Sequence, residues 1–370
     1  MGIIIRNRRR TTPRMFSTLA TFGLVTGMLA VLAPGASAGA VVNTCQASNR
    51  TQGTPSGSNL QDVIQAANRG DTITVRYVCV GNFTIDKNLR LVGRATPEVP
   101  RPILHADGAG RALLNSARVK LINLRITGGM VPRNGGGISN SGSLTLKDTV
   151  VHGNSAATGG GGIYNQSGTL TLRGASSVRG NTTTAYGGGG IYNHSATLVL
   201  LSTSSVTGNT AGAGGGIFSQ VSRSTVILND SSSVSGNTAN SGGGIFNESG
   251  TLTLNDSSSV SDNTAEVAGG GIAINESGTL TLNGTSAMSG NTSGDWGGGI
   301  YNYGNGAAVT LHDSSSVVGN TADSDDDASG TGGGVFVGCD GTLTGAVDGV
   351  NVNDNYLGTA TPVEDNIVSC

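Results

Sequence analysis

An acidic insertion near the C-terminus holds the residues best suited to bind a hard cation. Asp323, Asp325 and Asp327 alternate along the chain, as do the first carboxylates of a Ca²⁺-binding loop. The motif is incomplete, because Ala328 stands where such a loop needs its sharp-turn glycine and Gly334 where it needs a bidentate glutamate. The pattern favours a solvated loop, and a Ca²⁺ site at the three aspartates is the alternative.

A column of aromatic residues is the second candidate site. The chain contains eight copies of a glycine-rich repeat, and in six of them an aromatic residue directly follows an apolar one. Ser139 and Ala273 occupy that position in the other two copies. If the apolar side chain points inward in a strand, the next one points outward, where its ring can stack on a sugar or on a neighbouring ring. The predicted ligand-binding residues are Tyr164, Tyr192, Phe218, Phe246, Tyr301 and Phe336.

Groups for acid–base or nucleophilic catalysis do not gather into a motif. Asp230 with Asp256, and Glu248 with Glu276, recur at the repeat spacing, so adjacent coils would bring each pair to the about 5 to 9.5 Å used by glycoside hydrolases. Repetition alone explains these pairs. The four histidines are scattered, with no serine elbow or triad order beside them. The sequence therefore assigns no catalytic residue and requires no cofactor.

A repeat of 25 to 35 residues must position these side chains. Each copy holds three short runs with period two, such as Thr251-Leu252-Thr253-Leu254, separated by turn residues. No copy can bury its apolar face alone, so neighbours must stack as a solenoid. The inward residues after the glycines are predicted to be Ile138, Ile163, Ile191, Ile217, Ile245, Ile272, Ile300 and Val335.

Asparagines recur with the same period and predict two stacked columns, in which side-chain amides would satisfy buried polar groups of the next coil. The first column is Asn154, Asn181, Asn209, Asn237, Asn263, Asn291 and Asn320. The second column is Asn140, Asn165, Asn193, Asn247, Asn275 and Asn302.

Composition agrees with this architecture. The chain has 62 glycines in 370 residues and only 12% charged residues. Interior glycines destabilise helices by about 1 kcal/mol each, which disfavours a helical fold. The glycines follow no Gly-X-Y triplet, which excludes collagen. The prediction is an all-β, parallel β-helix with three strands per coil and a short N-terminal capping helix.

Charge is segregated along the chain. Residues 39–180 hold 15 basic and 6 acidic residues, whereas residues 181–370 hold one basic and 17 acidic residues. Such a dipole could bind polyanions near its start, cations near its end, or a second copy head to tail. Drift of composition among solvated positions is the other interpretation.

Export is predicted from the first 38 residues. A basic front, an apolar stretch and Ala36-Ser37-Ala38 form a secretory signal peptide, with an uncleaved anchor as the alternative. The predicted divisions are residues 1–38 as signal peptide, 39–127 as cap and irregular coils, 128–338 as regular repeats, and 339–370 as C-terminal cap. No later segment is apolar enough to cross a bilayer.

Two further features belong to the ends of the solenoid. An oxidising compartment favours disulfides, and the local pairings Cys45 with Cys79 and Cys339 with Cys370 suit an elongated molecule. The segment 58–70 has a capping-box form, with an apolar stripe and a terminal glycine, which predicts the short capping helix.

The segment 60–73, followed by Asn82-Phe83-Thr84-Ile85 and the Gly-Gly-Gly-Ile copies, resembles the pectin-lyase-like superfamily of right-handed parallel β-helices. The Gly-Gly-Gly-Ile copies are similar to repeats of polymorphic outer-membrane proteins. The resemblance implies that the predicted fold is a right-handed parallel β-helix. It leaves the activity open, because the superfamily holds polysaccharide lyases, hydrolases and adhesins.

The functional prediction is a secreted, extracellular or cell-surface protein that binds polysaccharide or another surface along its wall without catalysis. The alternative is a polysaccharide lyase of the pectate-lyase type, which would need Ca²⁺. No nucleic acid is expected as a partner, and head-to-tail self-association is compatible with the charge distribution.

Overall fold

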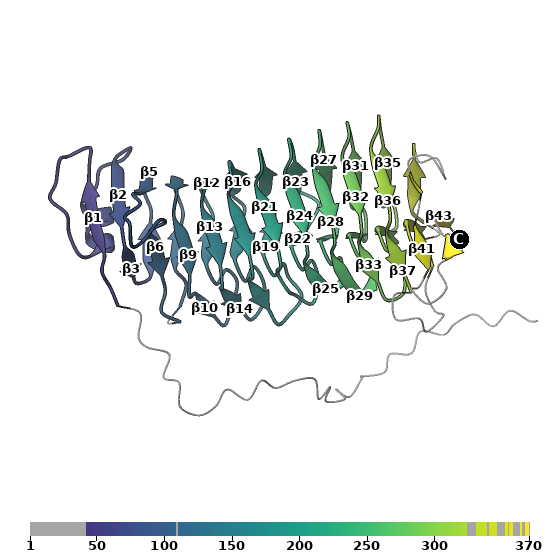
Figure 1. Ribbon diagram of the computed structural model, residues 1–370, viewed down its shortest axis with the longest axis horizontal. Helices are drawn as coiled ribbons and strands as arrows, with labels where there is room; N and C mark the ends of the chain where they lie inside the picture. The colour runs from purple at the N-terminus through teal and green to yellow at the C-terminus, as the bar shows by residue number, and fades with distance from the viewer. Residues whose placement is uncertain are drawn as a thin grey trace, which may run out of the picture. The chain divides into compact units, whose positions relative to one another are not determined.

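The computed structural model describes residues 42–108, 110–323, 331–338, 340–345, 352–353, 355–357, 363–364 and 367–369. All of them lie in the unit Val41–Cys370, which is a right-handed parallel β-helix, as predicted (Figure 1). The predicted signal peptide, residues 1–38, lies outside the described residues. So do Asp325, Asp327, Cys339 and Cys370.

Three long sheets form the walls of the solenoid, and each coil contributes one strand to each. Sheet A consists, in spatial order, of β1 (Gln46–Asn49), β2 (Thr72–Arg76), β5 (Leu89–Gly93), β8 (Arg118–Ile122), β12 (Ser143–Lys147), β16 (Thr169–Arg173), β20 (Thr197–Leu200), β23 (Thr225–Leu228), β27 (Thr251–Leu254), β31 (Thr279–Leu282), β35 (Ala308–Leu311) and β39 (Thr342–Thr344). All its neighbours are parallel except β1, which pairs antiparallel with β2 at the N-terminal edge.

Sheet B consists of β3 (Val78–Val80), β6 (Ile103–His105), β9 (Arg125–Thr127), β13 (Val150–His152), β17 (Ser177–Arg179), β21 (Ser205–Thr207), β24 (Ser233–Ser235), β28 (Ser259–Ser261), β32 (Ala287–Ser289), β36 (Ser316–Val318) and β40 (Val352–Asn353). Sheet C consists of β4 (Phe83–Ile85), β7 (Leu113–Asn115), β11 (Ile138–Asn140), β15 (Ile163–Gln166), β19 (Ile191–His194), β22 (Ile217–Gln220), β26 (Ile245–Asn247), β30 (Ile272–Ile274), β34 (Ile300–Asn302), β38 (Val335–Val337) and β43 (Ile367–Ser369).

Short strands between sheets B and C form two further ladders. One contains β10 (Met130–Val131), β14 (Ser155–Ala156) and β18 (Thr182–Thr183). The other contains β25 (Thr238–Ser241), β29 (Thr264–Ala268), β33 (Thr292–Ser293), β37 (Thr321–Ala322), β41 (Tyr356–Leu357) and β42 (Val363–Glu364).

The core is a stack of aliphatic layers inside the walls. Period two in each strand turns one set of side chains inward, and the register places like residues above one another, as with Leu170 beside Leu198. Leu172, Leu254 and Leu282 are completely buried, as predicted. Burial of these layers depends on neighbouring coils, which is why the repeat is stable only as a stack.

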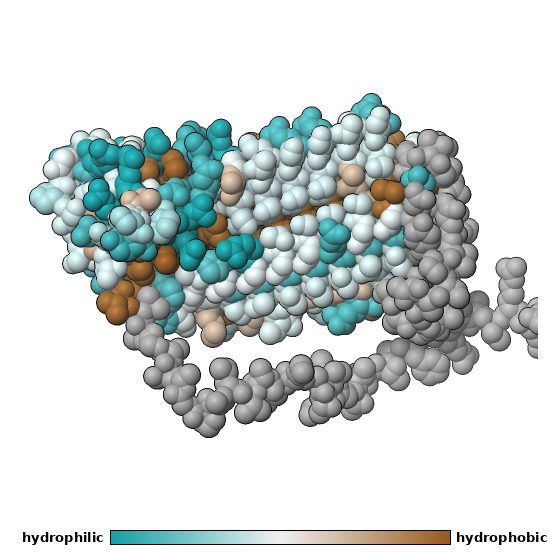
Figure 2. All heavy atoms as spheres, viewed as in Figure 1, coloured by the Kyte–Doolittle hydropathy of each residue, from teal (hydrophilic) through white to brown (hydrophobic). Residues whose placement is uncertain are grey.

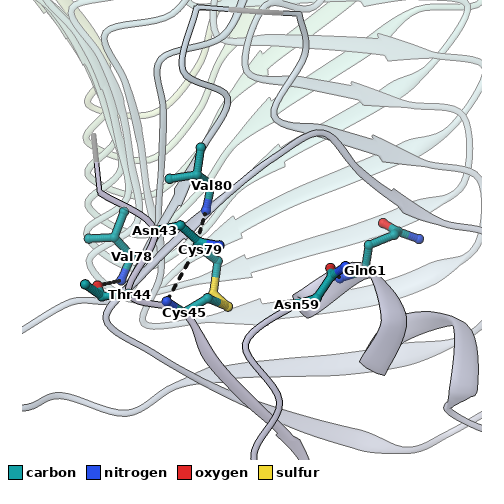
Figure 3. The surroundings of a disulfide bond; sticks show 8 residues. All are labelled: Asn43, Thr44, Cys45, Asn59, Gln61, Val78, Cys79 and Val80. Carbon is teal, nitrogen blue, oxygen red and sulfur yellow. Dashed lines mark hydrogen bonds between the residues drawn. A yellow bond between two sulfur atoms is a disulfide. The ribbon is translucent and has the colours of Figure 1, made fainter. Parts of the chain in front are cut away.

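The N-terminal end is closed by helix α1 (Leu60–Ala66) and a disulfide. Leu60 and Ile64 are buried against the first coils, and Cys45 is bonded to Cys79, which confirms that pairing (Figure 3). The N-cap of the helix is Asn59, whose side chain accepts a hydrogen bond from the backbone N–H of Gln61. The predicted capping box had placed the N-cap one residue earlier, at Ser58.

The side chain of Gln61 has a different partner, which explains why the capping box does not form. Its carbonyl oxygen accepts from the backbone N–H of Thr84 at 2.8 Å, and its amide donates to the carbonyl of Thr84 at 3.2 Å. The helix is thereby attached to β4. Among the described residues, no helix has the length and apolar character needed to cross a membrane.

The first asparagine column forms an uninterrupted ladder. Each side-chain amide donates to the side-chain oxygen of the next asparagine at 2.8–3.0 Å. Each of these oxygens also accepts the backbone N–H of the preceding asparagine. The ladder runs from Asn154 to Asn320, as predicted, and continues to Asn355.

The second asparagine column is interrupted, although Asn140, Asn165, Asn193, Asn247 and Asn302 share its register, as predicted. Side-chain bonds connect Asn115, Asn140, Asn165 and Asn193, after which Ser219 and later Ile274 occupy the column. The assignment of Asn275 to this column was wrong. Period two keeps Ile274 inward and leaves Asn275 exposed.

Candidate functional site

The aromatic column lies on the outer face of sheet C. The register places Tyr164 beside Tyr192, then Phe218, then Phe246 in successive coils. Ala273 follows as an interruption, and the column resumes with Tyr301 beside Phe336. The isoleucine or valine before each of these residues is buried, so alternation along the strand turns the aromatic side chain outward.

The four residues before the interruption form the N-terminal aromatic cluster, Tyr164, Tyr192, Phe218 and Phe246. Neighbouring ring centroids are 5.2–5.3 Å apart and the planes are tilted by 42–45°. Phe218 is only 6% exposed. Phe218 is therefore closed to a ligand, whereas Tyr164, Tyr192 and Phe246 are partly exposed.

The C-terminal aromatic cluster consists of Trp296, Tyr301, Tyr303 and Phe336, and its rings are nearly parallel. The angle between the ring plane of Tyr301 and that of Tyr303 is 11°, and the corresponding angles to Phe336 and Trp296 are 20° and 26°. The centroid distances from Tyr301 are 5.6, 5.3 and 6.2 Å in that order. Tyr303 is 58% exposed, so this cluster offers a ring to solvent.

A glycine makes room for the exposed ring. A Cβ at Gly338 would lie 2.5 Å from the ring of Tyr303, so any larger residue there would displace the tyrosine. Gly338 directly follows β38, which carries Phe336. The position of Tyr303 is therefore set by the neighbouring coil as well as by its own strand.

Burial raises the pKa of all three tyrosines in the column, Tyr164, Tyr192 and Tyr301. Desolvation, followed by the neighbouring Tyr164 and Glu248, raises the pKa of Tyr192 to about 12. Desolvation and Tyr303 raise the pKa of Tyr301 to about 12. Both hydroxyls stay protonated near neutral pH and can donate hydrogen bonds; that of Tyr192 donates to Gln220.

Trp296 and Tyr303 were not among the predicted site residues. Tyr303 is two residues beyond Tyr301, and period two along a strand is a signal that could have found it. Trp296 precedes the glycine triplet and forms bridges to Ala268 and Thr331, outside the column itself. The ladder that contains Trp296 runs back through Ala268, Ser241 and Ala213 to Tyr186, so small or polar residues separate its two aromatic positions and no regular repeat marks the tryptophan.

The carboxylates at the repeat spacing bind the backbone of the turns. Asp230, Asp256 and Asp313 adopt left-handed backbone conformations. Asp230 accepts from the N–H of Ser202 at 2.6 Å, and Asp256 accepts from the N–H of Asp230 at 2.9 Å. The predicted pair Asp230 and Asp256 is thus stacked, and the carboxylate of each closes a turn of the preceding coil.

The second carboxylate pair has one partly buried member. Burial is the largest cause of the raised pKa of Glu248, the charge of Glu276 adds to it, and a hydrogen bond with Gln220 opposes it. Glu276 accepts from the hydroxyl of Ser249 at 2.5 Å. Both residues therefore contact polar side chains of the same wall, close to the N-terminal aromatic cluster.

The histidines are distributed over all three walls. His105 and His152 lie in β6 and β13 of sheet B, and β9 separates these strands. His194 lies in sheet C, with its ring centroid 5.8 Å from that of Tyr192. His312 follows β35 of sheet A. The fold does not bring them together.

The predicted cation site is described only at its first residue. Asp323 follows β37 and has a φ of 51°, which is a turn conformation. Within the described ranges, no three His, Cys, Asp or Glu side chains are grouped as metal ligands. The Ca²⁺ assignment stays a prediction.

Comparison with known families adds one match. A model of the Chlamydia polymorphic membrane protein repeat matches residues 148–166 and 285–303. Each stretch runs from sheet B through the glycine triplet to sheet C, and the two contain Tyr164 and Tyr301. Neither a curated protein nor a solved structure matches the chain. The similarity to these repeats is confirmed, and the wider resemblance to the pectin-lyase-like superfamily stays a prediction.

Proposed function

We propose that this protein is a surface-associated, adhesin-like module that binds glycans without catalysis, using the C-terminal aromatic cluster as its platform. The observation that carries the proposal is the set of nearly parallel rings with Tyr303 exposed at its edge. An exposed aromatic face packs against the C–H face of a sugar ring, while phenol hydroxyls bond to its hydroxyl groups.

The two aromatic clusters differ in what they leave for a ligand. In the N-terminal cluster the rings are tilted by 42–45° and Phe218 is buried, whereas in the C-terminal cluster the other rings lie within 11–26° of the plane of Tyr301 and Tyr303 is exposed. A parallel set can extend its stack to one more flat group at low cost. We therefore place the sugar against Tyr303 and Trp296.

Surface association is supported by the matched repeat. Two stretches of the chain are similar to the repeat of a polymorphic membrane protein, and both belong to the wall that carries the aromatic column. The carboxylates Asp230, Asp256 and Asp313 bind backbone N–H groups, which favours a structural role for them over acid–base catalysis.

The test is retention of the purified protein on cellulose, chitin and xylan, followed by a glycan array. The double variant Trp296→Ala/Tyr303→Ala should bind about tenfold more weakly, since each ring contributes about 0.5–1.5 kcal/mol. Tyr192→Ala/Phe246→Ala is the matched control and should change retention less than about threefold.

Two results would contradict the proposal. Equal loss in both double variants would show that the C-terminal cluster has no special role. Appearance of unsaturated products from polygalacturonate with Ca²⁺ would show that the protein is a lyase and not a binding module without catalysis.

A further inference from the structure

A groove on the outer face of sheet A is lined by four cations. It has a volume of about 340 Å³ and crosses β5, β8, β12 and β16. The charged lining residues are Arg90, Lys120, Lys147 and Arg173, all exposed. The uncharged lining residues are Ile122, Thr145 and Thr171. We call this set the basic groove.

The register brings like charges into direct opposition. Arg90 lies opposite Lys120, and Lys147 lies opposite Arg173 on the neighbouring strand. Like charges directly opposite one another destabilise a sheet. The only ion pair among the described residues joins Lys147 to Asp148 at 4.0 Å, and Asp148 also accepts from the backbone N–H of Ala175. Arg90, Lys120 and Arg173 therefore have no ion-pair partner within the described part of the chain.

The fold itself does not require these cations, as later coils show. The column that contains Arg90 and Lys120 has only uncharged residues from Thr145 to Thr310, which are Thr145, Thr171, Val199, Ile227, Thr253, Thr281 and Thr310. Threonines satisfy the same outward positions without repulsion, because they carry no charge. Charge at the N-terminal coils thus opposes stability and indicates a binding role.

The positive surface extends beyond the groove toward the N-terminal edge of the same sheet. A second hollow of about 580 Å³ is lined by Arg50, Arg76 and Arg94 together with polar residues of β1 and β2. Figure 2 shows strongly hydrophilic residues gathered over the N-terminal coils, whereas much of the visible wall of the later coils is of intermediate hydropathy. A ligand that follows the sheet could contact cations over several successive coils.

We propose that the basic groove binds a linear acidic polysaccharide, with its sulfate or carboxylate groups on Arg90, Lys120, Lys147 and Arg173. Such groups form charge-assisted hydrogen bonds with guanidinium and ammonium ions. The hydroxyls of Thr145 and Thr171 supply neutral partners for sugar hydroxyls, and Ile122 offers an apolar contact.

Other polyanions fit the groove less well. Single-stranded nucleic acids are bound by positive grooves that also offer aromatic rings for base stacking, and the lining contains none. A lipid surface is flat, whereas the cations here line a recess. The site is separate from the C-terminal aromatic cluster, since it lies on sheet A and the aromatic column lies on sheet C.

The test compares dextran sulfate, hyaluronate and unmodified dextran as fluorescent ligands at several salt concentrations. Binding of either acidic polymer should weaken as salt rises, because salt screens exposed charges. If dextran sulfate binds and hyaluronate does not, the groove recognises sulfate groups. If hyaluronate binds and dextran sulfate does not, it recognises carboxylate groups. Lys120→Gln/Arg173→Gln should reduce acidic-polymer binding about tenfold or more.

The matched control is Arg133→Gln/Arg179→Gln, which removes the same charge from exposed positions outside the groove. It should change binding less than about threefold. Equal losses in both double variants, binding of unmodified dextran at the same strength, or no binding of either acidic polymer would overturn the proposal. Tighter binding of DNA or of phosphatidylglycerol vesicles than of both acidic polymers would also overturn it.

Discussion

The side chain of Asn209 donates to Oδ1 of Asn237 at 2.9 Å, and the backbone N–H of Asn209 donates to the same oxygen at 3.0 Å. One buried side-chain oxygen thus satisfies two donors of the preceding coil. The amide of Asn237 meanwhile donates to Val206, Ser235 and Asn263. Each asparagine of the first column therefore connects three coils.

Replacement of Asn237 by alanine should lower the free energy of unfolding by about 2–4 kcal/mol. Two buried donors of Asn209 would lose their acceptor, and a buried unsatisfied polar group costs about 1–3 kcal/mol. Asn255→Ala is the control, because Asn255 belongs to a partly exposed ladder with Asn229 and Asn283. Denaturant unfolding should show a loss below about 1 kcal/mol there; equal losses would contradict the structural role of the buried column.

Gly244→Ala should destabilise the solenoid by more than about 2 kcal/mol. The added Cβ would lie 2.7 Å from the carbonyl oxygen of Gly271 and 2.9 Å from the amide nitrogen of Asn263, so the coils would have to separate. Gly180→Ala is the comparison, because a Cβ added at Gly180 would meet no atom within 4 Å. This substitution should cost only the strain of a left-handed backbone, which is about 1–2 kcal/mol. A smaller thermal shift for Gly244→Ala than for Gly180→Ala would be inconsistent with the close packing of the glycine triplets.

Removal of the N-terminal disulfide should lower stability by about 3 kcal/mol. Cys45 and Cys79 are 34 residues apart and both are buried beside the capping helix. Cys45→Ser/Cys79→Ser should melt earlier than the oxidised wild type. Addition of reductant should lower the melting temperature of the wild type and leave that of the variant less affected, and an identical response in both would argue against this bond.

His152 should make the protein less stable as pH falls below about 6.5. Burial, and then the charges of Arg125 and Arg179, lower the pKa of His152 from its ordinary value of 6.5. Below pH 6.5 the unfolded chain binds a proton that the folded chain does not, so the free energy of unfolding decreases until the folded pKa is passed. NMR titration should place the pKa of His152 below 6.5, and Arg179→Gln should raise it. A titration midpoint at or above 6.5 would contradict this environment.

The repeat made the main features of the fold predictable. Its spacing located the inward residues, such as Leu254, and the first asparagine column, because stacked copies must place equal residues above one another. Asn275 was misplaced because the shared motif was followed in preference to the alternation along the strand. At this position the motif and the alternation disagree, and the apolar Ile274 is the residue that points inward, because its burial stabilises the core.

The binding surfaces were only partly predictable. The aromatic column follows from the repeat, whereas Trp296 packs on it from a bridge position outside sheet C, where most residues of the other coils are small or polar. The basic groove could not be predicted from spacing, because Arg90 and Lys120 precede the regular copies and the sequence does not reveal their register. Only the successive pairing of β5 with β8, of β8 with β12 and of β12 with β16 shows that the four cations line one groove.

Trp296 is the single tryptophan of the chain, so its fluorescence reports directly on the C-terminal aromatic cluster. Titration with a glycan that retains the protein should change the emission of Trp296 saturably, with the same midpoint as retention. Tyr303→Ala should weaken both signals together. Glycan binding with an unchanged emission spectrum throughout the titration would contradict the proposal that this cluster is the glycan-binding platform.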